Sequence, residues 1–264
     1  MSSNAITSID NSAWTGMVAV EDTALYVSDS GGNGPAVVYL NGTYANHKHF
    51  WRVIAELGSD FRHIVFDERA RGKSEQSADY SFEACLRDLD AVLTARGVQR
   101  PILVGWSYGA LIAVHWADRH PDRVAGVVAL DGAVPYGLTG EEGAQRIRKL
   151  FAPMRPMLPV LRPLGLAARM SLEQHIEVNI EQNALNAASA PLLERLTTAV
   201  RYIQCTGGSI GGDAEEMEAM RASLEPVLAR NANLKVSAKV ASNHAKVLRK
   251  DFRAVADTVR TLVG

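Results

Sequence analysis

A serine between two glycines, where an apolar run gives way to a helical pattern, constrains this chain most. The pattern G-x-S-x-G at residues 105–109 follows the apolar residues 101–104 and precedes the helix-like run 110–117. A sharp turn from a strand into a helix brings its flanking residues close to neighbouring backbone, which favours glycine at both ends. Such a turn would lift the Ser107 hydroxyl above the edge of a sheet as a nucleophile. The simpler alternative is an inert serine in a tight turn.

Chain length and net charge favour a globular protein and give no sign of a nucleic-acid or membrane partner. The 264 residues suffice for a sizeable core that needs neither disulfides nor metals. The formal net charge of -1 favours neither nucleic acid nor an anionic membrane as a partner. Cys85 and Cys205 lie in apolar or mixed runs, so we expect free, buried thiols. The chain starts without a signal-peptide pattern and has no run of membrane-spanning length, so we expect a cytoplasmic protein.

Apolar runs of strand length alternate with helical patterns along most of the chain. This alternation predicts a mostly parallel sheet of about eight strands with helices on both faces. The runs 17–20 and 24–27 flank a short polar turn, as a hairpin would. Ligands of such sheets bind beyond the carboxyl ends of the strands. We therefore expect four residues that each follow a predicted strand to cluster there, namely Thr43, Ser107, Asp131 and His244.

Residues 135–197 interrupt the alternation because they contain no strand candidate. The pairs Thr139 with Glu142 and Ser171 with Gln174 have the spacing of capping boxes, which predicts two helix starts. We interpret the segment as a helical cap that lies over the carboxyl edge of the sheet. Residues 1–134 and 198–264 then form the core domain.

Together these pieces resemble the alpha/beta hydrolase family over nearly the whole chain. The matching parts are the serine turn, the helical insertion, a late histidine, and the motifs at 40–42, 67–74 (D-x-R-G-x-G-x-S in the family) and 120–124. Two positions depart from the pattern, because Asn41 stands where the family has histidine and Ala70 replaces the first glycine of the 67–74 loop. The resemblance implies a hydrolase that needs no cofactor and no metal. We expect a small-molecule substrate, and a homodimer stays open.

A serine hydroxyl needs an adjacent base to become a nucleophile. Among seven histidines, His244 lies between the last predicted strand and the last predicted helix, where the family keeps its base. His47 and His49 lie near the predicted oxyanion loop and are runners-up for substrate contact, although solvated helix residues are the simpler interpretation. His244 is therefore the predicted general base.

The acid that orients this histidine has two candidates. In most members of the family it follows the strand that here spans 201–205, where Asp213 is the candidate. In some relatives, including zearalenone-type lactonases, it follows the strand after the serine turn, and Asp131 occupies that place. We favour Asp131 and keep Asp213 as runner-up. Each aspartate could instead merely cap a turn or a helix.

The resemblance assigns the oxyanion hole to the backbone N–H groups of Thr43 and Tyr108. Trp106, beside the serine, and Tyr44, after the oxyanion loop, are candidates for substrate binding, with core packing as the alternative for Trp106. The basic residues Arg69, Arg71 and Lys73 are expected to lie in a solvated loop, with binding of a carboxylate as the minor alternative.

The resulting hypothesis is a serine hydrolase that cleaves a carboxylic ester or lactone of a small hydrophobic molecule through an acyl-enzyme on Ser107. Three alternatives use the same triad: hydrolysis of a C–C bond beside a ketone, of an amide, or acyl transfer. A ligand-binding receptor of this fold and a non-catalytic domain are further alternatives. Haloalkane dehalogenase and epoxide hydrolase chemistry is disfavoured, because those relatives need an aspartate where Ser107 stands.

Overall fold

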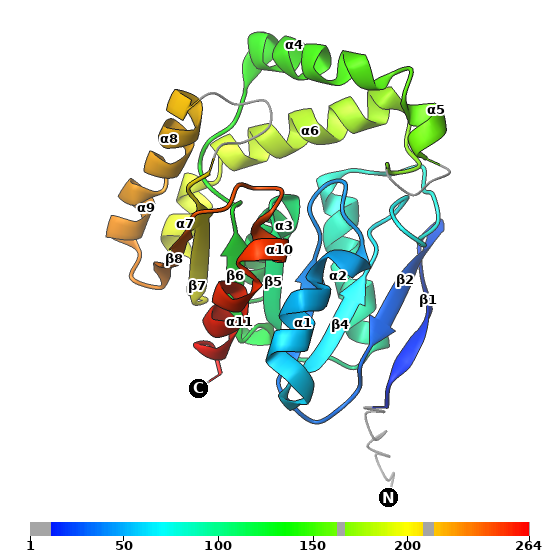
Figure 1. The fold of residues 1–264 in the computed structure, drawn as a ribbon, viewed down its shortest axis with the longest axis vertical. Coiled ribbons are helices and arrows are strands. Elements are labelled where there is room, and N and C mark those ends of the chain that lie inside the picture. Colours follow the sequence, from blue (N-terminus) through cyan, green and yellow to red (C-terminus); the bar gives the residue numbers. More distant parts are fainter. Residues whose placement is uncertain (1–11, 163–166, 208–213, 264) are drawn as a thin grey trace, which may run out of the picture.

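The strands form one sheet, as predicted. The structure is a computed structural model and describes residues 12–162, 167–207 and 214–263. Within these ranges the sheet has eight strands in the order β1-β2-β4-β3-β5-β6-β7-β8 (Figure 1). Their bounds are β1 Trp14–Val20, β2 Thr23–Asp29, β3 Ala36–Leu40, β4 Arg62–Phe66, β5 Ile102–Trp106, β6 Gly126–Leu130, β7 Val200–Cys205 and β8 Leu234–Val240.

Strand direction follows from the connections. β1 and β2 form the predicted hairpin, and β2 also runs antiparallel to β4. The remaining neighbours are parallel, because helices connect them. Every residue of β4 and β6 is buried, as expected for strands covered on both faces. This places the carboxyl ends of β3, β5, β6, β7 and β8 along one edge.

Helices cover both faces of the sheet. One face packs against α2 (Phe82–Ala95), α3 (Tyr108–Arg119), α7 (Ala190–Arg195) and α9 (Glu225–Arg230). The other face packs against α1 (Trp51–Leu57), α10 (Val247–Lys250) and α11 (Phe252–Arg260). The expected fold class is therefore confirmed. No helix within the described ranges has the length and apolar character that crossing a membrane requires.

The segment between β6 and β7 lies over the carboxyl edge of the sheet (Figure 1). It contains α4 (Gly140–Phe151), α5 (Leu158–Leu161), α6 (Leu172–Ala187) and α7, and none of its described residues forms a strand. We call the part from α4 to α6 the cap. Its apolar cluster consists of Ile147, Phe151, Leu158 and Leu172. Leu192 and Leu193 of α7, which the sequence analysis places in the cap range, pack into the main core, and so do Met170 and Val178 of the cap itself.

The structure corrects several local expectations. Ser171 and Gln174 form the predicted capping box of α6, but Thr139 caps α4 without a side-chain hydrogen bond. The helix predicted from Asp213 to about 229 is instead two, α8 (Ala214–Ala222) and α9, because Pro226 lacks an N–H and begins a new first turn. The predicted final helix is likewise split into α10 and α11 at Asp251, whose backbone leaves the helical region.

Candidate active site

Ser107 occupies a strained turn between β5 and α3. Its φ is 56° and its ψ is -114°, a conformation that non-glycine residues rarely adopt. A Cβ on Gly105 would lie 2.3 Å from the carbonyl oxygen of Gly109, and a Cβ on Gly109 would lie 2.2 Å from that of Leu40. Both glycines are therefore required by close backbone contacts. These contacts impose the strained turn, which places the Ser107 side chain at the carboxyl edge of the sheet.

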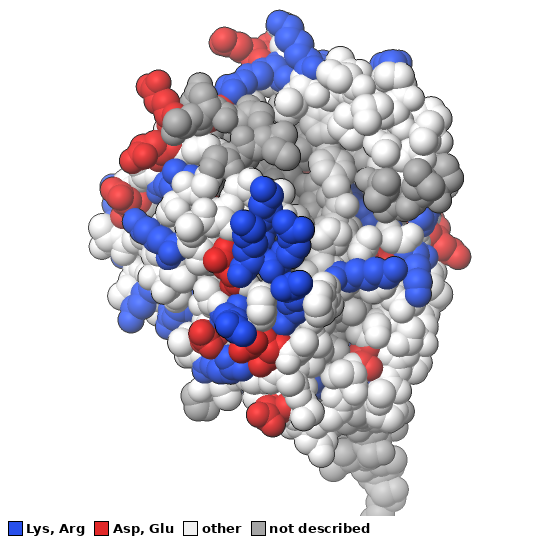
Figure 2. All heavy atoms as spheres, viewed as in Figure 1, with Lys and Arg blue, Asp and Glu red and all other residues white. Residues whose placement is uncertain are grey.

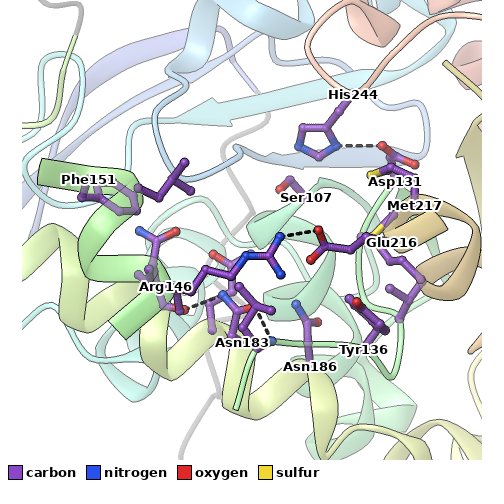
Figure 3. A pocket seen from close by; sticks show the side chains of 18 of the residues that line it. Ser107, Asp131, Tyr136, Arg146, Phe151, Asn183, Asn186, Glu216, Met217 and His244 are labelled. Atoms are coloured by element: carbon purple, nitrogen blue, oxygen red, sulfur yellow. Dashed lines mark hydrogen bonds and ion pairs between the residues drawn. The ribbon is translucent and has the colours of Figure 1, made fainter. Parts of the chain in front are cut away.

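Asp131 and His244 meet beside this serine. Asp131 follows β6 and His244 follows β8, and Asp131 Oδ2 lies 2.7 Å from His244 Nδ1 (Figure 3). The carboxylate is buried, and its other oxygen accepts a hydrogen bond from the backbone N–H of Cys205 at 3.0 Å. Because Nδ1 is engaged by Asp131, Nε2 is the ring nitrogen that remains available to another partner. The runner-up acid, Asp213, lies outside the described residues.

Gly132 allows the end of β6 to lie against the serine turn. A Cβ on Gly132 would lie 2.4 Å from the carbonyl oxygen of Ser107, and Asp131 itself has a φ of 47°. The Ser107 N–H also donates to the carbonyl oxygen of Leu130 at 2.9 Å. These contacts hold the end of β6, and with it Asp131, against the serine turn.

The loop after β3 carries Thr43, the predicted oxyanion residue. Arg71 Nε donates to the carbonyl oxygen of Thr43 at 2.9 Å, and the Thr43 hydroxyl donates to Gln182 Oε1 at 3.2 Å. Tyr108, the other oxyanion residue, is the first residue of α3, so its N–H has no partner within the helix. The Tyr108 side chain points into the core, with its hydroxyl 3.6 Å from Cys85 Sγ.

Asn41 fixes the start of the same loop. Its backbone N–H donates to Glu68 Oε1 at 2.8 Å, and its side-chain amide donates to Glu68 Oε2 at 3.1 Å and to the carbonyl oxygen of Phe66 at 2.8 Å. Burial raises the pKa of Glu68 to about 7. The asparagine that replaces the family's histidine thus has a structural partner of its own.

The expectation of a solvated basic loop was wrong for two of its three residues. Arg69 is fully buried and binds Asp88 through two hydrogen bonds of 2.8 and 2.5 Å. Arg71 is buried under the oxyanion loop. Buried guanidinium groups need carboxylate or carbonyl partners, and such partners are distant in the sequence, so the basic run alone did not reveal them.

Of the runner-up histidines, His47 has a structural partner. Its Nδ1 lies 2.8 Å from Asp67 Oδ2, and its backbone N–H donates to Asp67 Oδ1 at 2.6 Å. His49 lies nearer the site, because its ring centroid is 5.9 Å from that of Trp106. Trp106 in turn lies 5.5 Å from the ring of His244.

Two cavities meet at Ser107 and His244, between the core and the cap. The first has a volume of about 580 Å³, and its wall includes Tyr136, Ile147, Met217 and the ion pair between Arg146 and Glu216 (Figure 3). The second has a volume of about 590 Å³, and its wall includes Thr43, Tyr44, Trp106 and Ala245. The predicted substrate-binding residues Tyr44 and Trp106 therefore line the second cavity. Asp131 contributes to the wall of the first.

Sequence reasoning missed the amides of α6 that face these cavities. Asn179, Gln182, Asn183 and Asn186 recur at helical spacing on one face and line the first cavity. Asn179 donates to the Tyr44 hydroxyl at 3.0 Å, so α6 contacts the oxyanion loop at two points. The signal was present, because four amides at positions i, i+3, i+4 and i+7 form a polar stripe where a covering helix is usually apolar.

Both cysteine side chains lie next to residues of the candidate site, Cys85 beside Tyr108 and Cys205 beside Asp131. Cys85 and Cys205 are free and buried, as expected, and burial raises the pKa of Cys85 to about 12. Within the described ranges, three His, Cys, Asp or Glu side chains never converge as metal ligands would.

Comparisons with known proteins agree with this architecture. The model of the alpha/beta hydrolase fold family matches residues 35–157. A haloalkane dehalogenase from Mesorhizobium japonicum is 29% identical over 163 residues, which cover 61% of this chain and 50% of the relative. Two matches to epoxide hydrolase B of Mycobacterium tuberculosis each cover 32% of the relative, so these alignments span half or less of the curated proteins.

Solved structures match over almost the entire chain. An esterase from Exiguobacterium antarcticum has a TM-score of 0.73 at 19% identity, covering 94% of this chain and 98% of that one. An enol-lactonase from Burkholderia xenovorans has a TM-score of 0.71 at 19% identity, covering 94% of this chain and 99% of that one. At such identities the likeness concerns the fold. The sheet order, the serine turn and the family match over residues 35–157 together show that the chain has the alpha/beta hydrolase fold.

Proposed function

We propose that the protein is a serine hydrolase that cleaves carboxylic esters or lactones of small molecules. One observation carries the proposal: the Asp131 carboxylate lies 2.7 Å from His244 Nδ1, and the same histidine shares two cavities with the strained Ser107. A nucleophile, a base and an acid that orients the base are the three groups that acyl transfer to serine requires.

The reaction then proceeds in two halves. Ser107 Oγ attacks the substrate carbonyl carbon while its proton passes to His244 Nε2, and Asp131 stabilises the resulting imidazolium. The backbone N–H groups of Thr43 and Tyr108 stabilise the negative oxygen. The C–O bond breaks as the imidazolium returns the proton to the leaving oxygen. In the second half, water attacks the acyl-enzyme with His244 as base, and the carboxylic acid product and free Ser107 are released.

The nucleophile type separates this proposal from the activity named for the dehalogenase relative. A carboxylate that attacks a saturated carbon forms an ester, which water can cleave through the carbonyl group. A serine that attacks the same carbon forms an ether, which has no carbonyl group and would end the cycle. With serine at residue 107, the productive substrate is therefore an acyl compound.

Active-site labelling and one substitution test the proposal. Wild-type protein is expected to hydrolyse p-nitrophenyl butyrate and to be labelled at Ser107 by a fluorophosphonate. Ser107→Ala is expected to lose label and to lower kcat by about 10⁴-fold or more. Ser237→Ala, at an exposed position on β8, is the matched control and is expected to keep both properties. Full turnover in Ser107→Ala would disprove the proposal.

A further inference from the structure

A groove opens on the outer side of the second cavity. It lies between the short helix His47–Phe50 and the start of α10, with a volume of about 650 Å³. Its wall shares His49, Trp106 and Ala245 with the cavity that contains Ser107 and His244. The groove and the candidate active site are therefore neighbours with a common rim. We call it the outer groove.

Three cations line the outer groove: Lys48 from one side, and Lys246 and Arg249 from the other. Lysines and arginines gather over α10 in Figure 2. Within the described ranges, these three cations have no ion pair with a carboxylate, whereas several surface arginines elsewhere have one, such as Arg195 with Asp118 and Arg230 with Glu194. Because the whole chain has a net charge of -1, this local excess of positive charge is a feature of the groove and not of the protein as a whole.

Apolar surface completes the groove. Trp51 and Leu248 line it, and 59% of the surface of Trp51 is exposed. Arg52 lies over the Trp51 ring at 4.8 Å from its centroid. An exposed tryptophan beside unpaired cations suits a ligand that has a flat or apolar portion next to an anionic group.

The loop that contains His244 also indicates which end of a substrate would face the outer groove. Asn243, His244 and Ala245 all line the second cavity, whereas only His244 of these lines the first. A leaving group in the second cavity would therefore lie against the loop that returns its proton. Beyond that leaving group, across the rim at Trp106, are the cations of the outer groove.

We propose that the outer groove binds a phosphate group at the far end of the substrate's leaving arm, while the acyl group lies at Ser107. This inference rests on the proposed hydrolase function and names its substrate class: acyl esters or thioesters of a phosphorylated alcohol or thiol. Three cations match the two negative charges of a phosphate monoester better than the single charge of a carboxylate. The phosphate takes no part in bond breaking and contributes affinity and orientation.

Paired substrates test the inference. S-butyryl-coenzyme A and S-butyryl-N-acetylcysteamine carry the same thioester, but only the first has phosphates. 4-(Butyryloxy)benzyl phosphate and 4-(butyryloxy)benzyl alcohol form a second pair with a shorter arm. In at least one pair, kcat/KM is expected to be about tenfold or more higher for the phosphorylated member, and to fall toward parity as NaCl rises from 20 to 300 mM.

Charge reversal provides the second readout. The double substitution Lys246→Glu with Arg249→Glu is expected to abolish the preference for the phosphorylated substrate. The preference is measured as the ratio of kcat/KM between the two members of the substrate pair for which wild type shows it. Lys235→Glu, at an exposed position near the start of β8, is the control and is expected to leave the ratio unchanged. Far-ultraviolet circular dichroism establishes that each variant is folded.

The outcomes separate this inference from the function on which it rests. Ser107-dependent turnover of the neutral members, with ratios near one in both pairs, would overturn the groove assignment and leave the hydrolase intact. A preference that survives charge reversal would also overturn it. Absence of Ser107-dependent turnover of any member would overturn both.

Discussion

The core and the cap meet over Ser107, but they differ in the structure that supports the residues they contribute to the site. In the core, Ser107 and Asp131 follow the buried strands β5 and β6, and His244 follows the edge strand β8 of the same sheet, which has apolar clusters on both faces. The cap has a small apolar cluster of its own, and it presents amides to the cavities. Loops fixed by a sheet hold reacting groups at defined separations, whereas a helix face changes with each side chain. The proposed function therefore assigns the reaction to the core and part of the choice of substrate to the cap.

Each region also holds the other in place. Arg169 of the segment before α6 donates its backbone N–H to the carbonyl oxygen of Ala70 at 2.8 Å and its side chain to the carbonyl oxygen of Gly72 at 2.8 Å. Gln182 and Asn179 of α6 bind Thr43 and Tyr44. The cap thus touches both the loop after β4 and the oxyanion loop, and its effect on the reaction can be measured separately from that of the core.

The largest expected effect tests the core. Asp131→Asn would place an amide against His244 Nδ1 and favour the wrong tautomer, so kcat on p-nitrophenyl butyrate should fall by about 10³–10⁴-fold. Asp213→Asn is the matched comparison and is expected to keep activity within about threefold of wild type. If only Asp213→Asn loses activity, Asp131 is not the acid.

The next effect concerns the cap and depends on pH. His175 of α6 is fully buried beside Tyr44, with ring centroids 5.4 Å apart, and burial, followed by the charge of Arg71, lowers its pKa from 6.5 to about 4. The unfolded chain then binds the extra proton between these values, so stability falls as the pH drops from about 6.5 to 4. The loss should reach about 2–3 kcal/mol.

His175→Phe keeps a ring against Tyr44 and removes this titration. Urea unfolding at pH 7.5, 6.0 and 4.5 should therefore show a smaller loss of stability for the variant than for wild type. Equal losses in the two proteins would mean that His175 does not titrate as its burial implies.

A smaller effect tests the link between the regions. Gln182→Leu and Thr43→Val each remove the side-chain hydrogen bond but keep the Thr43 backbone N–H, so kcat should fall about threefold to tenfold in either variant. The double variant should show little additional loss, because both changes break one contact. Gln145→Leu, an exposed amide on α4, is the control. Independent, multiplying losses in the double variant would contradict the link.

The smallest effect concerns backbone strain in the core. Ala70 has a φ of 63°, the left-handed region that glycine adopts without cost. Ala70→Gly should therefore raise the free energy of unfolding by about 0.5–1 kcal/mol, after the greater flexibility of glycine in the unfolded chain is included. Ala91→Gly, in the middle of α2, is the comparison and should lower it by about 1 kcal/mol. A decrease in Ala70→Gly would show that the strain is relieved elsewhere.

The sheet was predictable because its signals are local. Continuous apolar strands, the glycines around Ser107 and the order of strand and helix are all properties of short stretches of sequence. These signals also indicated which residues follow strands, and hence that Asp131 and His244 would lie at one edge, 113 residues apart in sequence. In a parallel sheet, residues that directly follow different strands lie at the same edge, even when they are far apart in the sequence.

Contacts between distant segments were not predictable in this way. The burial of Arg69 in the loop after β4 depends on Asp88 of α2, and the contact of Gln182 with Thr43 spans 139 residues. Pro226 and Asp251 interrupt helices whose apolar periodicity continues across the break. Such features arise from the packing of distant segments against one another, which cannot be predicted from any single stretch of sequence.

The position of Asp131 has a consequence for recombining proteins of this kind. Two residues separate the proposed acid from Val134, where the chain starts toward the cap, and Gly132 between them must stay bare to clear the serine turn. A graft that replaces the covering helices with those of a relative should therefore begin after Gly132. If the junction were placed a few residues earlier, the graft would remove Asp131 together with the cap. A loss of turnover in the chimera would then be attributed to the new helices, although the missing carboxylate beside the His244 imidazole would be its cause.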